Sequence, residues 1–388
     1  MVYLDNAATT FPKPARVCDE MCRCMRGYCG NPGRGAHPIA MAAAGKVFEC
    51  RERLASFFGA PGADHVIMTP NATAALNLAI KGLVSADACA RGQERIHLII
   101  SDLEHNSVLR PVERLLRDGL ADYSVFPTGA ERGGAGAEEI LAGISRLICR
   151  RTRAVICTAA SNICSVRLPL REIGAMCRGR GILFIVDGAQ GAGHFLINVA
   201  NMCIDALALP GHKGLYGPQG SGALILGGRY LPVPLLEGGS GSMSFETEMP
   251  PDPPERYEAG TLNVPAAAGL CAGLDFLDSV GMENVARHEE MLFDYAIERL
   301  GMIRGVKIYA PEARGPVLGF SLDGITPDST ANAIGKAGVC VRGGYHCAPL
   351  AHRALGSEEQ GSVRASFGYF NTCADIDAMC RVLLSLRC

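Results

Sequence analysis

Residues 182–190 read Ile-Leu-Phe-Ile-Val-Asp-Gly-Ala-Gln, an apolar run that ends in an acidic residue and a turn. A short apolar run closed by a turn signal is typical of a buried strand. Comparable runs precede and follow it, at residues 95–101, 123–127, 153–159, 205–209 and 222–226. Helix-like stretches separate several of these runs, at residues 107–118, 137–150 and 169–178. Strands that alternate with helices predict βαβ units, and therefore a mainly parallel sheet flanked by helices.

The chain changes character after the last of these strands. Residues 227–259 are rich in Gly, Pro and Ser, which disfavour regular structure. A loop of this length in a folded domain is usually functional or a linker. Beyond it we predict helices at residues 266–278, 284–300 and 375–386, and strands at 317–322 and 338–341. This order of elements indicates a second, smaller unit of α+β type.

The composition of the 388-residue chain excludes several classes of protein. Its 48% hydrophobic content supports a folded core and its length suggests about two domains. A net charge of −2 without a basic stripe argues against nucleic-acid binding. We find neither an apolar run long enough for a membrane helix nor a signal peptide at the N-terminus. We therefore expect a cytoplasmic protein, in which most of the seventeen cysteines are reduced and buried.

Two charged residues follow predicted strands, at the sheet edge where parallel sheets bind ligands. Lys213 lies in Gly-His-Lys-Gly, directly after the strand at 205–209. It is either a surface lysine in a turn or a buried amine that reacts with an aldehyde, because burial lowers the pKa of an ammonium group. Asp187 ends the strand at 182–187 and could simply cap a helix. Together they fit a pyridoxal 5′-phosphate (PLP) site, in which a carboxylate pairs with the pyridine nitrogen.

Two further segments fit the same type of site. His105 follows the strand at 95–101 and could either stack on a flat ring or be structural. Residues 69–77, Thr-Pro-Asn-Ala-Thr-Ala-Ala-Leu-Asn, form a polar turn that opens a helix. Free N–H groups and the positive end of the helix dipole suit a phosphate there, although an ordinary capped helix would have the same sequence.

Two residues near the C-terminus stand out by their surroundings. Cys347 follows His346 in a glycine-rich loop, where the pKa of a thiol can be lowered toward a reactive thiolate. Arg364 lies within an apolar, strand-like run and therefore needs an anionic partner. A substrate carboxylate, bound by two parallel hydrogen bonds, would be a suitable one.

These segments, in this order, resemble the class-V aminotransferase family of PLP enzymes, and within it the branch of cysteine desulfurases and selenocysteine lyases. The resemblance extends from Tyr-Leu-Asp-Asn-Ala-Ala at 3–8 to residues 364–371. It rests on the segments Asp-Gly-Ala-Gln (187–190), Gly-His-Lys (211–213), Gly-Thr-Leu-Asn (260–263) and His-Cys-Ala-Pro (346–349). It implies an α/β fold of PLP type I. The large cofactor domain would span residues 12–285, and the small domain residues 1–11 and 286–388.

The resemblance also implies a role for each candidate residue. Lys213 would bind the cofactor and move the substrate's α-proton, His105 would stack on the ring and take part in proton transfer, and Cys347 would accept sulfur. The remaining cofactor contacts would be Asp187 to the pyridine nitrogen, Gln190 to the phenolic oxygen, Asn71, Ala72, Thr73 and His212 to the phosphate, and Thr261 to the phosphate of a partner subunit. The substrate-binding residues would be Asn162, Arg342 and Arg364.

The activity implied is that of an L-cysteine desulfurase, which leaves alanine and a persulfide on Cys347. A homodimer with shared sites and a dedicated sulfur-acceptor protein would be its partners. Selenocysteine lyase, or a class-V aminotransferase or C–S lyase acting without a persulfide, are the alternatives. A non-catalytic sulfur-relay or metal-binding protein is a third hypothesis, supported only by Cys18, Cys22, Cys24 and Cys29. Their spacing matches no familiar zinc pattern, so we expect no metal site.

Three positions depart from the family pattern. Pro210 stands where a Ser or Thr is common, Ala74 where an acidic residue often follows the phosphate turn, and Tyr345 where a His is common. These departures bear on the substrate more than on the cofactor.

Overall fold

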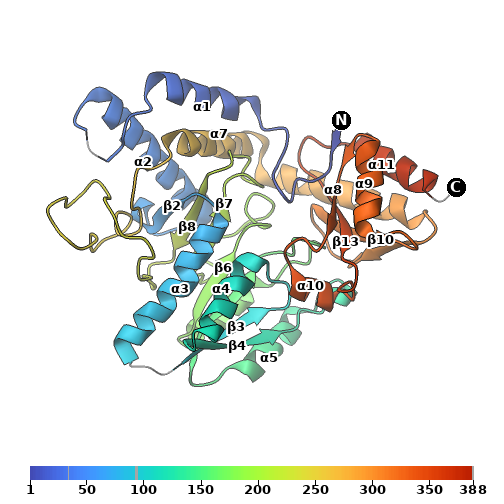
Figure 1. Ribbon diagram of the computed structural model, residues 1–388, viewed down its shortest axis with the longest axis horizontal. Coiled ribbons are helices and arrows are strands. Elements are labelled where there is room, and N and C mark those ends of the chain that lie inside the picture. The colour runs from blue at the N-terminus through green and yellow to red at the C-terminus, as the bar shows by residue number, and fades with distance from the viewer. Residues whose placement is uncertain (34, 92–94, 387–388) are drawn as a thin grey trace.

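The computed structural model describes residues 1–33, 35–91 and 95–386. Its centre is a seven-stranded sheet in the order β2-β8-β7-β6-β5-β3-β4 (Figure 1). The strands are β2 (Val66–Thr69), β3 (Ile96–Ser101), β4 (Ala121–Phe126), β5 (Thr152–Thr158), β6 (Leu183–Asp187), β7 (Ala206–Pro210) and β8 (Gly222–Leu226). Only β8 runs against its two neighbours, and all other pairs are parallel. The expected mainly parallel sheet is confirmed.

Helices cover both faces of this sheet. They are α1 (Ala15–Gly27), α2 (Pro38–Phe58), α3 (Ala72–Arg91), α4 (Asn106–Arg117), α5 (Ala137–Leu147), α6 (Leu170–Gly179) and α7 (Val264–Val280), with short 3-10 turns at Ala63–His65 and Ala130–Arg132. One core packs α2, α5, α6 and α7 on one face, and a second packs α3 and α4 on the other. Successive residues of a strand, such as Ile99 and Ile100, belong to different cores. Burial on both faces explains why these strands read as continuous apolar runs.

The C-terminal part forms a smaller unit around a four-stranded antiparallel sheet of order β12-β13-β10-β9. Its elements are α8 (Met282–Gly301), β9 (Val306–Tyr309), β10 (Val317–Leu322), α9 (Pro327–Lys336), β12 (Arg342–Gly344), α10 (Pro349–Ala354), β13 (Ser362–Ser366) and α11 (Cys373–Ser385). The N-terminal strand β1 (Val2–Tyr3) joins this unit by pairing with β11 (Val339–Cys340). Both chain ends therefore lie at the smaller unit (Figure 1).

The predicted elements differ from the observed ones mainly in the N-terminal and C-terminal thirds. Helices α1, α2, α9 and α10 and strands β1, β2 and β9 were not predicted. The strand expected at 338–341 is instead two short strands, because β11 pairs with β1 while β12 pairs with β13 in another sheet. Residues 227–259 contain neither helix nor strand, as their composition predicts.

The described residues contain no single helix that is long and apolar enough to cross a membrane. Helices α7 and α8 reach those limits only as a pair, and they are bent by 79° at their junction.

Candidate active site

The turns that follow β3, β6 and β7 meet at the carboxyl edge of the central sheet. They carry His105, Asp187 with Gln190, and Lys213. These side chains line a pocket of about 100 Å³. The other residues that line it are Asn71, Ala72, Thr73, Ser107, Thr158, Asn162, Ala189, Pro210 and His212. The structure therefore brings together every predicted cofactor residue except Thr261, because parallel strands place their carboxyl ends at one edge.

Lys213 lies on a tightly packed glycine turn. A Cβ on Gly214 would lie 2.2 Å from the carbonyl oxygen of Ala192, so only glycine fits next to the lysine. Burial lowers the pKa of the Lys213 amine to about 8, and the nearby carboxylate of Asp187 opposes this shift. A substantial fraction of this amine is consequently neutral just above physiological pH.

The N-terminal segment fixes the backbone of the lysine turn. The carbonyl oxygen of His212 accepts hydrogen bonds from the Thr10 amide at 3.1 Å and from Lys13 Nζ at 2.7 Å. Thr10 Oγ1 also donates to the carbonyl oxygen of Lys213 at 3.1 Å. Thr10 and Lys13 were not among the predicted site residues. Their contact spans about 200 residues of sequence, and no local pattern signals it.

Asp187 and Gln190 form the buried floor of the pocket. The Asp187 side chain is 2% exposed, and its Oδ1 accepts a hydrogen bond from the amide of Ala189 at 2.9 Å. Burial raises the pKa of this carboxyl, and that amide and Lys213 act in the opposite direction. Gln190 is 4% exposed and donates from Nε2 to the carbonyl oxygen of Ala7 at 3.0 Å. Its Oε1 is buried without a hydrogen-bond partner among the described residues.

His105 caps the N-terminus of α4. Its Nδ1 accepts a hydrogen bond from the amide of Ser107 at 3.0 Å, which places the proton of the neutral ring on Nε2. The Ser107 hydroxyl also bridges His105 Nδ1 and the hydroxyl of Thr73, at 2.8 and 3.0 Å. Burial, followed by the charges of Lys213 and Arg364, lowers the pKa of His105 to about 4. The ring is therefore neutral at physiological pH.

Behind this turn lies Glu104, which was not among the predicted site residues. Its carboxyl is fully buried and accepts hydrogen bonds from the hydroxyl of Ser101 and from the amide of Thr158. Burial raises the pKa of Glu104 to about 8, with the two hydrogen bonds acting against it. The side chain thus ties the turn that carries His105 to the neighbouring strand β5.

The opposite end of the pocket is the start of α3. Asn71 Oδ1 accepts from the amide of Ala74 at 2.9 Å and so caps the helix. The first N–H groups of a helix have no partner within it, and the helix dipole makes this end attractive to anions. His212 lies beside it. Burial lowers the pKa of His212 to about 4, and its Nδ1 is buried without a hydrogen-bond partner among the described residues.

The expected substrate residues are neighbours, because Arg364 contacts Asn162 and pairs with Arg342. Arg364 is 3% exposed on β13 and donates from Nη2 to Asp5 Oδ1 at 2.8 Å and from Nη1 to the carbonyl oxygen of Asn162 at 3.2 Å. Its Nε and Asn162 Oδ1 are buried without partners among the described residues. Arg342, which pairs directly across from Arg364 in the β12–β13 ladder, is exposed. The anionic partner of Arg364 in the structure is therefore Asp5, which the sequence analysis did not assign.

Cys347 lies on a short, fixed loop at the mouth of this pocket. His346 and Cys347 both have positive φ angles, of 47° and 56°, which non-glycine residues rarely adopt. Asn162 Nδ2 donates to the carbonyl oxygen of His346 at 2.8 Å, and the amide of Asn106 donates to that of Cys347 at 2.7 Å. The exposed thiol lines an open pocket of about 330 Å³ with Thr73, His105 and Ser107, which also line the inner pocket.

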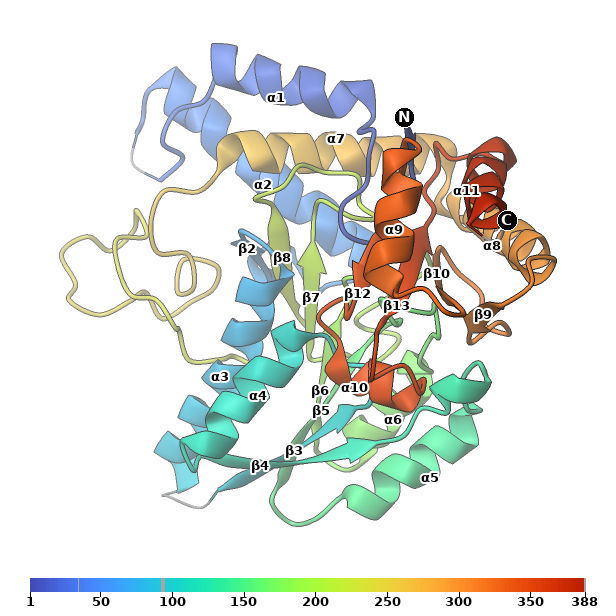
Figure 2. The ribbon, with the colours of Figure 1, turned by 45° about the vertical axis from the view of Figure 1, so that its right-hand side comes forward.

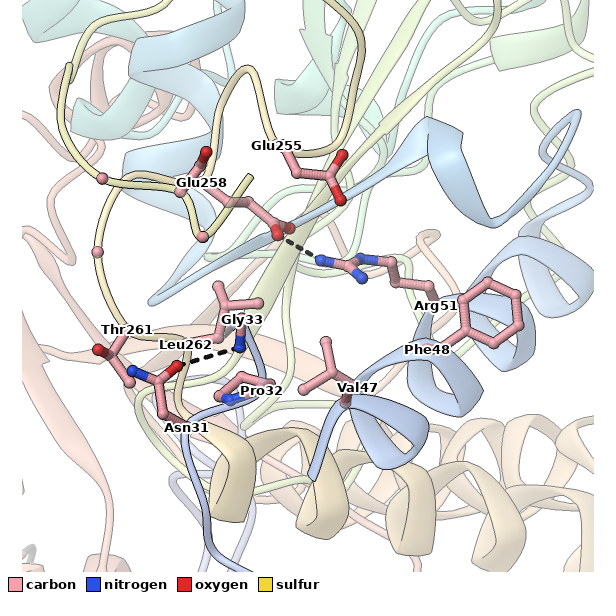
Figure 3. Close-up of a pocket in the computed structure, with 15 residues that line it drawn as sticks. Asn31, Pro32, Gly33, Val47, Phe48, Arg51, Glu255, Glu258, Thr261 and Leu262 are labelled. Atoms are coloured by element: carbon pink, nitrogen blue, oxygen red, sulfur yellow. Dashed lines mark hydrogen bonds and ion pairs between the residues drawn. The ribbon is translucent and has the colours of Figure 1, made fainter. Parts of the chain in front are cut away.

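Thr261 is the one predicted cofactor residue that lies elsewhere. It is exposed and lines a separate pocket of about 410 Å³ with Asn31, Gly33, Arg51 and Glu258 (Figure 3). Glu258 accepts hydrogen bonds from Arg51 and from the amide of Met68, and burial raises its pKa to about 7. Thr261 does not line the inner pocket of its own chain.

The geometry of the pocket agrees with comparisons to known proteins. A profile of the family described as aminotransferase class-V matches residues 2–379. The chain belongs to the class-V aminotransferase family. Two relatives of this family member are described as probable cysteine desulfurases. That of Streptomyces coelicolor is 34% identical, covering 98% of this chain and 90% of the relative. That of Methanothermobacter thermautotrophicus is 32% identical, covering 97% and 92%.

Among solved structures, an apo cysteine desulfurase from Thermococcus onnurineus matches the class-V chain with a TM-score of 0.88. The two sequences are 29% identical, and the match covers 99% of this chain and 94% of the other. The protein is therefore a PLP-dependent enzyme of fold type I, as its resemblance predicts.

The pocket of this class-V enzyme fits PLP. A buried carboxylate, that of Asp187, is in place for a pyridine nitrogen, and the N-terminus of α3 is in place for a phosphate. Buried polar atoms normally have hydrogen-bond partners. Gln190 Oε1 and His212 Nδ1 have none within the described part of the chain, and both residues line the pocket. A bound polar cofactor would supply these missing partners.

The departures from the family pattern have simple structural consequences in this class-V enzyme. Pro210 ends β7 and lines the pocket without a hydroxyl to offer a phosphate. Ala74 has no polar side chain, and its backbone amide donates a hydrogen bond to Asn71 Oδ1. Tyr345 is exposed and donates from its hydroxyl to the carbonyl oxygen of Glu359 at 3.1 Å.

The N-terminal cysteines do not gather around one point. Cys18, Cys22 and Cys29 are exposed, whereas Cys24 is buried against α2 and α7. Within residues 1–33, 35–91 and 95–386, no three His, Cys, Asp or Glu side chains are placed to hold a metal ion.

Proposed function

We propose that the protein is an L-cysteine desulfurase, which removes sulfur from cysteine, leaves alanine and holds the sulfur as a persulfide on Cys347. The observation that carries this proposal is the exposed thiol of Cys347 at the mouth of the pocket that contains Lys213 and Asp187. An aminotransferase, or a lyase that works by elimination, has no use for a thiol at this point. The relatives described as probable cysteine desulfurases support the same activity.

Residues of the inner pocket would hold PLP. Asp187 would pair with the pyridine nitrogen, Gln190 would bond the phenolic oxygen, and His105 would lie against the ring. His212 and the start of α3, residues 71–73, would hold the phosphate. The bound cofactor withdraws electrons from the substrate's α-carbon, which makes the α-proton removable.

The chain's own residues would position the substrate and move its proton. Arg364 Nε and Asn162 Nδ2 would orient the substrate carboxylate by donating to it, because Arg364 is buried and its Nε still has a hydrogen to donate. The Lys213 amine would take the α-proton in its neutral form, which its lowered pKa of about 8 makes available. His105 is neutral and carries its hydrogen on Nε2, so this atom would donate a hydrogen bond above the ring rather than give up a proton.

Cys347 would carry out the sulfur transfer. Its thiolate attacks the substrate sulfur, and a new S–S bond forms as the C–S bond breaks. The electron pair of the broken bond stays with the substrate carbon, which takes up a proton and becomes alanine. The hydrogen bonds from Asn106 and Asn162 to the loop backbone hold the thiol facing the mouth of the pocket.

We also propose that the enzyme is a homodimer in which Thr261 reaches the phosphate site of the partner subunit. Thr261 lies in a loop region rich in exposed apolar side chains, among them Leu236 at 71% and Phe245 at 98% exposure, with Phe48 of α2 nearby in the same pocket as Thr261. Exposed apolar side chains in one region mark a surface that another protein covers. The many free cysteines support a reducing compartment, and we propose the cytoplasm.

A substrate panel tests the activity. The purified holoenzyme is given cysteine, selenocysteine or cysteine sulfinate with dithiothreitol, and alanine is measured together with sulfide, selenide or sulfite. We expect equal amounts of alanine and sulfide from cysteine. Cys347→Ala should keep the visible absorption of bound PLP and lose sulfide release. Undiminished sulfide release from this variant would contradict the persulfide route, and a preference for selenocysteine that survives it would favour a selenocysteine lyase.

A further inference from the structure

The helix beside the Cys347 thiol carries a row of arginines. Helix α4 begins at Asn106, whose amide is bonded to the carbonyl oxygen of Cys347, and Arg110 and Arg114 follow on the next two turns. Residues four apart lie on one face of a helix. Both arginines are exposed, and both line the open pocket of about 330 Å³ that also contains Cys347 and Lys81. We call this pocket the α4 groove. Figures 1 and 2 both show α10, which follows Cys347, beside α4.

The α4 groove is cationic because basic side chains line it. No Asp or Glu of the described residues lines it. Arg110 has no ion-pair partner in the part of the chain that the structure describes. Arg114 pairs with Asp118 at 2.7 Å, but both side chains are exposed, so solvent and salt weaken this pair. Glu113, the acidic residue within α4, accepts a hydrogen bond from the hydroxyl of Tyr123 instead.

These arginines are not needed for the small substrate. A cysteine carboxylate has its own buried guanidinium at Arg364, deeper in the site and fixed by Asp5. The arginines do not line the inner pocket. They line the α4 groove, which also contains Cys347. A ligand that fills the groove is therefore placed against the thiol rather than against Lys213.

We infer that the α4 groove docks an acidic segment of an acceptor protein, which brings its own cysteine to the persulfide on Cys347. This inference rests on the proposed function. The acceptor thiolate attacks the outer sulfur of the persulfide, the S–S bond to Cys347 breaks, and its electron pair leaves with the Cys347 thiolate. The acceptor then carries the persulfide, and no outside oxidant or reductant is needed.

Binding of a short acidic probe tests the groove directly. The probe is a fluorescent peptide, Gly-Glu-Glu-Glu-Glu-Ser-Gly, and its control has four glutamines in place of the glutamates. We expect the holoenzyme to bind the glutamate peptide and to lose this binding as salt is raised. The double variant Arg110→Gln/Arg114→Gln should bind it roughly tenfold more weakly, because it lacks two surface charge contacts. The matched variant Arg304→Gln/Arg381→Gln removes two exposed arginines of the smaller unit and should bind as the unaltered enzyme does.

Sulfur transfer tests the second half of the inference. The same peptides with Cys in place of Ser are incubated with the holoenzyme and cysteine, and their mass gain of one sulfur atom is followed. The glutamate peptide should gain sulfur faster than the glutamine peptide, and this advantage should disappear in Arg110→Gln/Arg114→Gln. Sulfide release with dithiothreitol should stay within about twofold in that variant, since a small reductant needs no docking.

Two outcomes overturn the inference: equal behaviour of the glutamate and glutamine peptides, or an advantage that survives loss of both arginines. Failure of the proposed function would give a different result: the unaltered holoenzyme would release no sulfide from cysteine with dithiothreitol. The binding assay does not depend on that reaction, so it shows separately whether the α4 groove binds an acidic segment.

Discussion

At the scale of single residues, the site depends on charges that the fold holds in fixed positions. Arg364 lies in the middle of a buried strand, where an unpaired charge would be strongly destabilising. Asp5, contributed by the opposite end of the chain, supplies the counter-charge through one carboxylate oxygen and leaves Arg364 Nε without a partner among the described residues. Asp5 therefore acts as a positioning residue that presents a prepared guanidinium to the substrate carboxylate.

We expect Asp5→Asn to raise the KM for cysteine roughly tenfold while kcat changes less than threefold. The amide can still accept a hydrogen bond, but it no longer fixes Arg364 by charge. The free energy of unfolding should fall by about 1–2 kcal/mol, because Asp5 is partly exposed and water takes over part of its role. Steady-state kinetics and urea unfolding check both numbers, and Asp323→Asn, at an exposed carboxylate, is the control. An unchanged KM would show that Asp5 only neutralises Arg364.

The lowered pKa of Lys213 makes a prediction about pH. Below about pH 8 the amine is mostly protonated and cannot accept a proton, and above it the neutral form predominates. In the Cys347→Ala holoenzyme, the α-proton of bound alanine should therefore exchange with deuterated solvent at a rate that rises with pH and levels off above about pH 8. NMR of the α-position measures this rate without any contribution from Cys347. Lys213→Ala should abolish the exchange, and a rate independent of pH between 6 and 9 would assign proton transfer to another group.

At the scale of elements, a buried pair joins the cofactor turn to the smaller unit. His194 follows the Asp187–Gln190 turn, and its Nδ1 lies 2.8 Å from Glu289 of α8. Both side chains are almost completely buried. The ring of His194 also packs against Gly214, next to Lys213. Helix α8 thereby supports the lysine turn from behind, although its surface contributes no side chain to the inner pocket.

The adjacent residues Glu289 and Glu290 provide a matched comparison. We expect Glu289→Ala to lower the free energy of unfolding by about 2–4 kcal/mol, because it leaves buried His194 without its partner. Glu290→Ala breaks a pair with Arg167 at 2.9 Å in which both side chains are about one-third exposed, so the loss should stay below about 1 kcal/mol. Thermal and urea unfolding of the two variants measure the difference. Equal losses would mean that the buried pair contributes no more than the surface pair.

Sequence reasoning succeeded where local pattern decides structure. The strands of the central sheet are apolar runs buried on both faces, and the residues after β6 and β7 had to meet at one edge. It missed contacts between distant segments, such as Thr10 and Lys13 with His212, Asp5 with Arg364, and β1 with β11. These pairings are set by the packing of the whole chain. It also missed α2, because many small residues blur its helical apolar period, and α1, although Val17, Met21 and Cys24 have the spacing of one helix face.

At the scale of the whole molecule, the N-terminal segment links the two units at the site. Strand β1 belongs to the smaller unit, Asp5 contacts Arg364, and the carbonyl of Ala7 accepts from Gln190. A few residues later, Thr10 and Lys13 hold the lysine turn of the large unit. The division into domains at residues 11 and 285 stays a proposal. Under this division, the N-terminal segment aligns the substrate residues of the small domain with the cofactor residues of the large domain.

The proposed dimer makes the last prediction, because it requires each cofactor site to be built from two chains. Lys213 acts in its own chain, whereas Thr261 would act in the partner subunit. When Lys213→Ala and Thr261→Ala chains are mixed, unfolded and refolded together, a mixed dimer has one site with both residues intact and one with neither. We expect each mixed dimer to bind PLP tightly at one of its two sites. The amount of PLP that the mixture retains on dialysis measures this. A Lys213→Ala/Thr261→Ala chain mixed with unaltered chain should form no complete site in its mixed dimers. If Thr261 served its own chain instead, the first mixture would gain nothing and the second would keep one intact site in each mixed dimer.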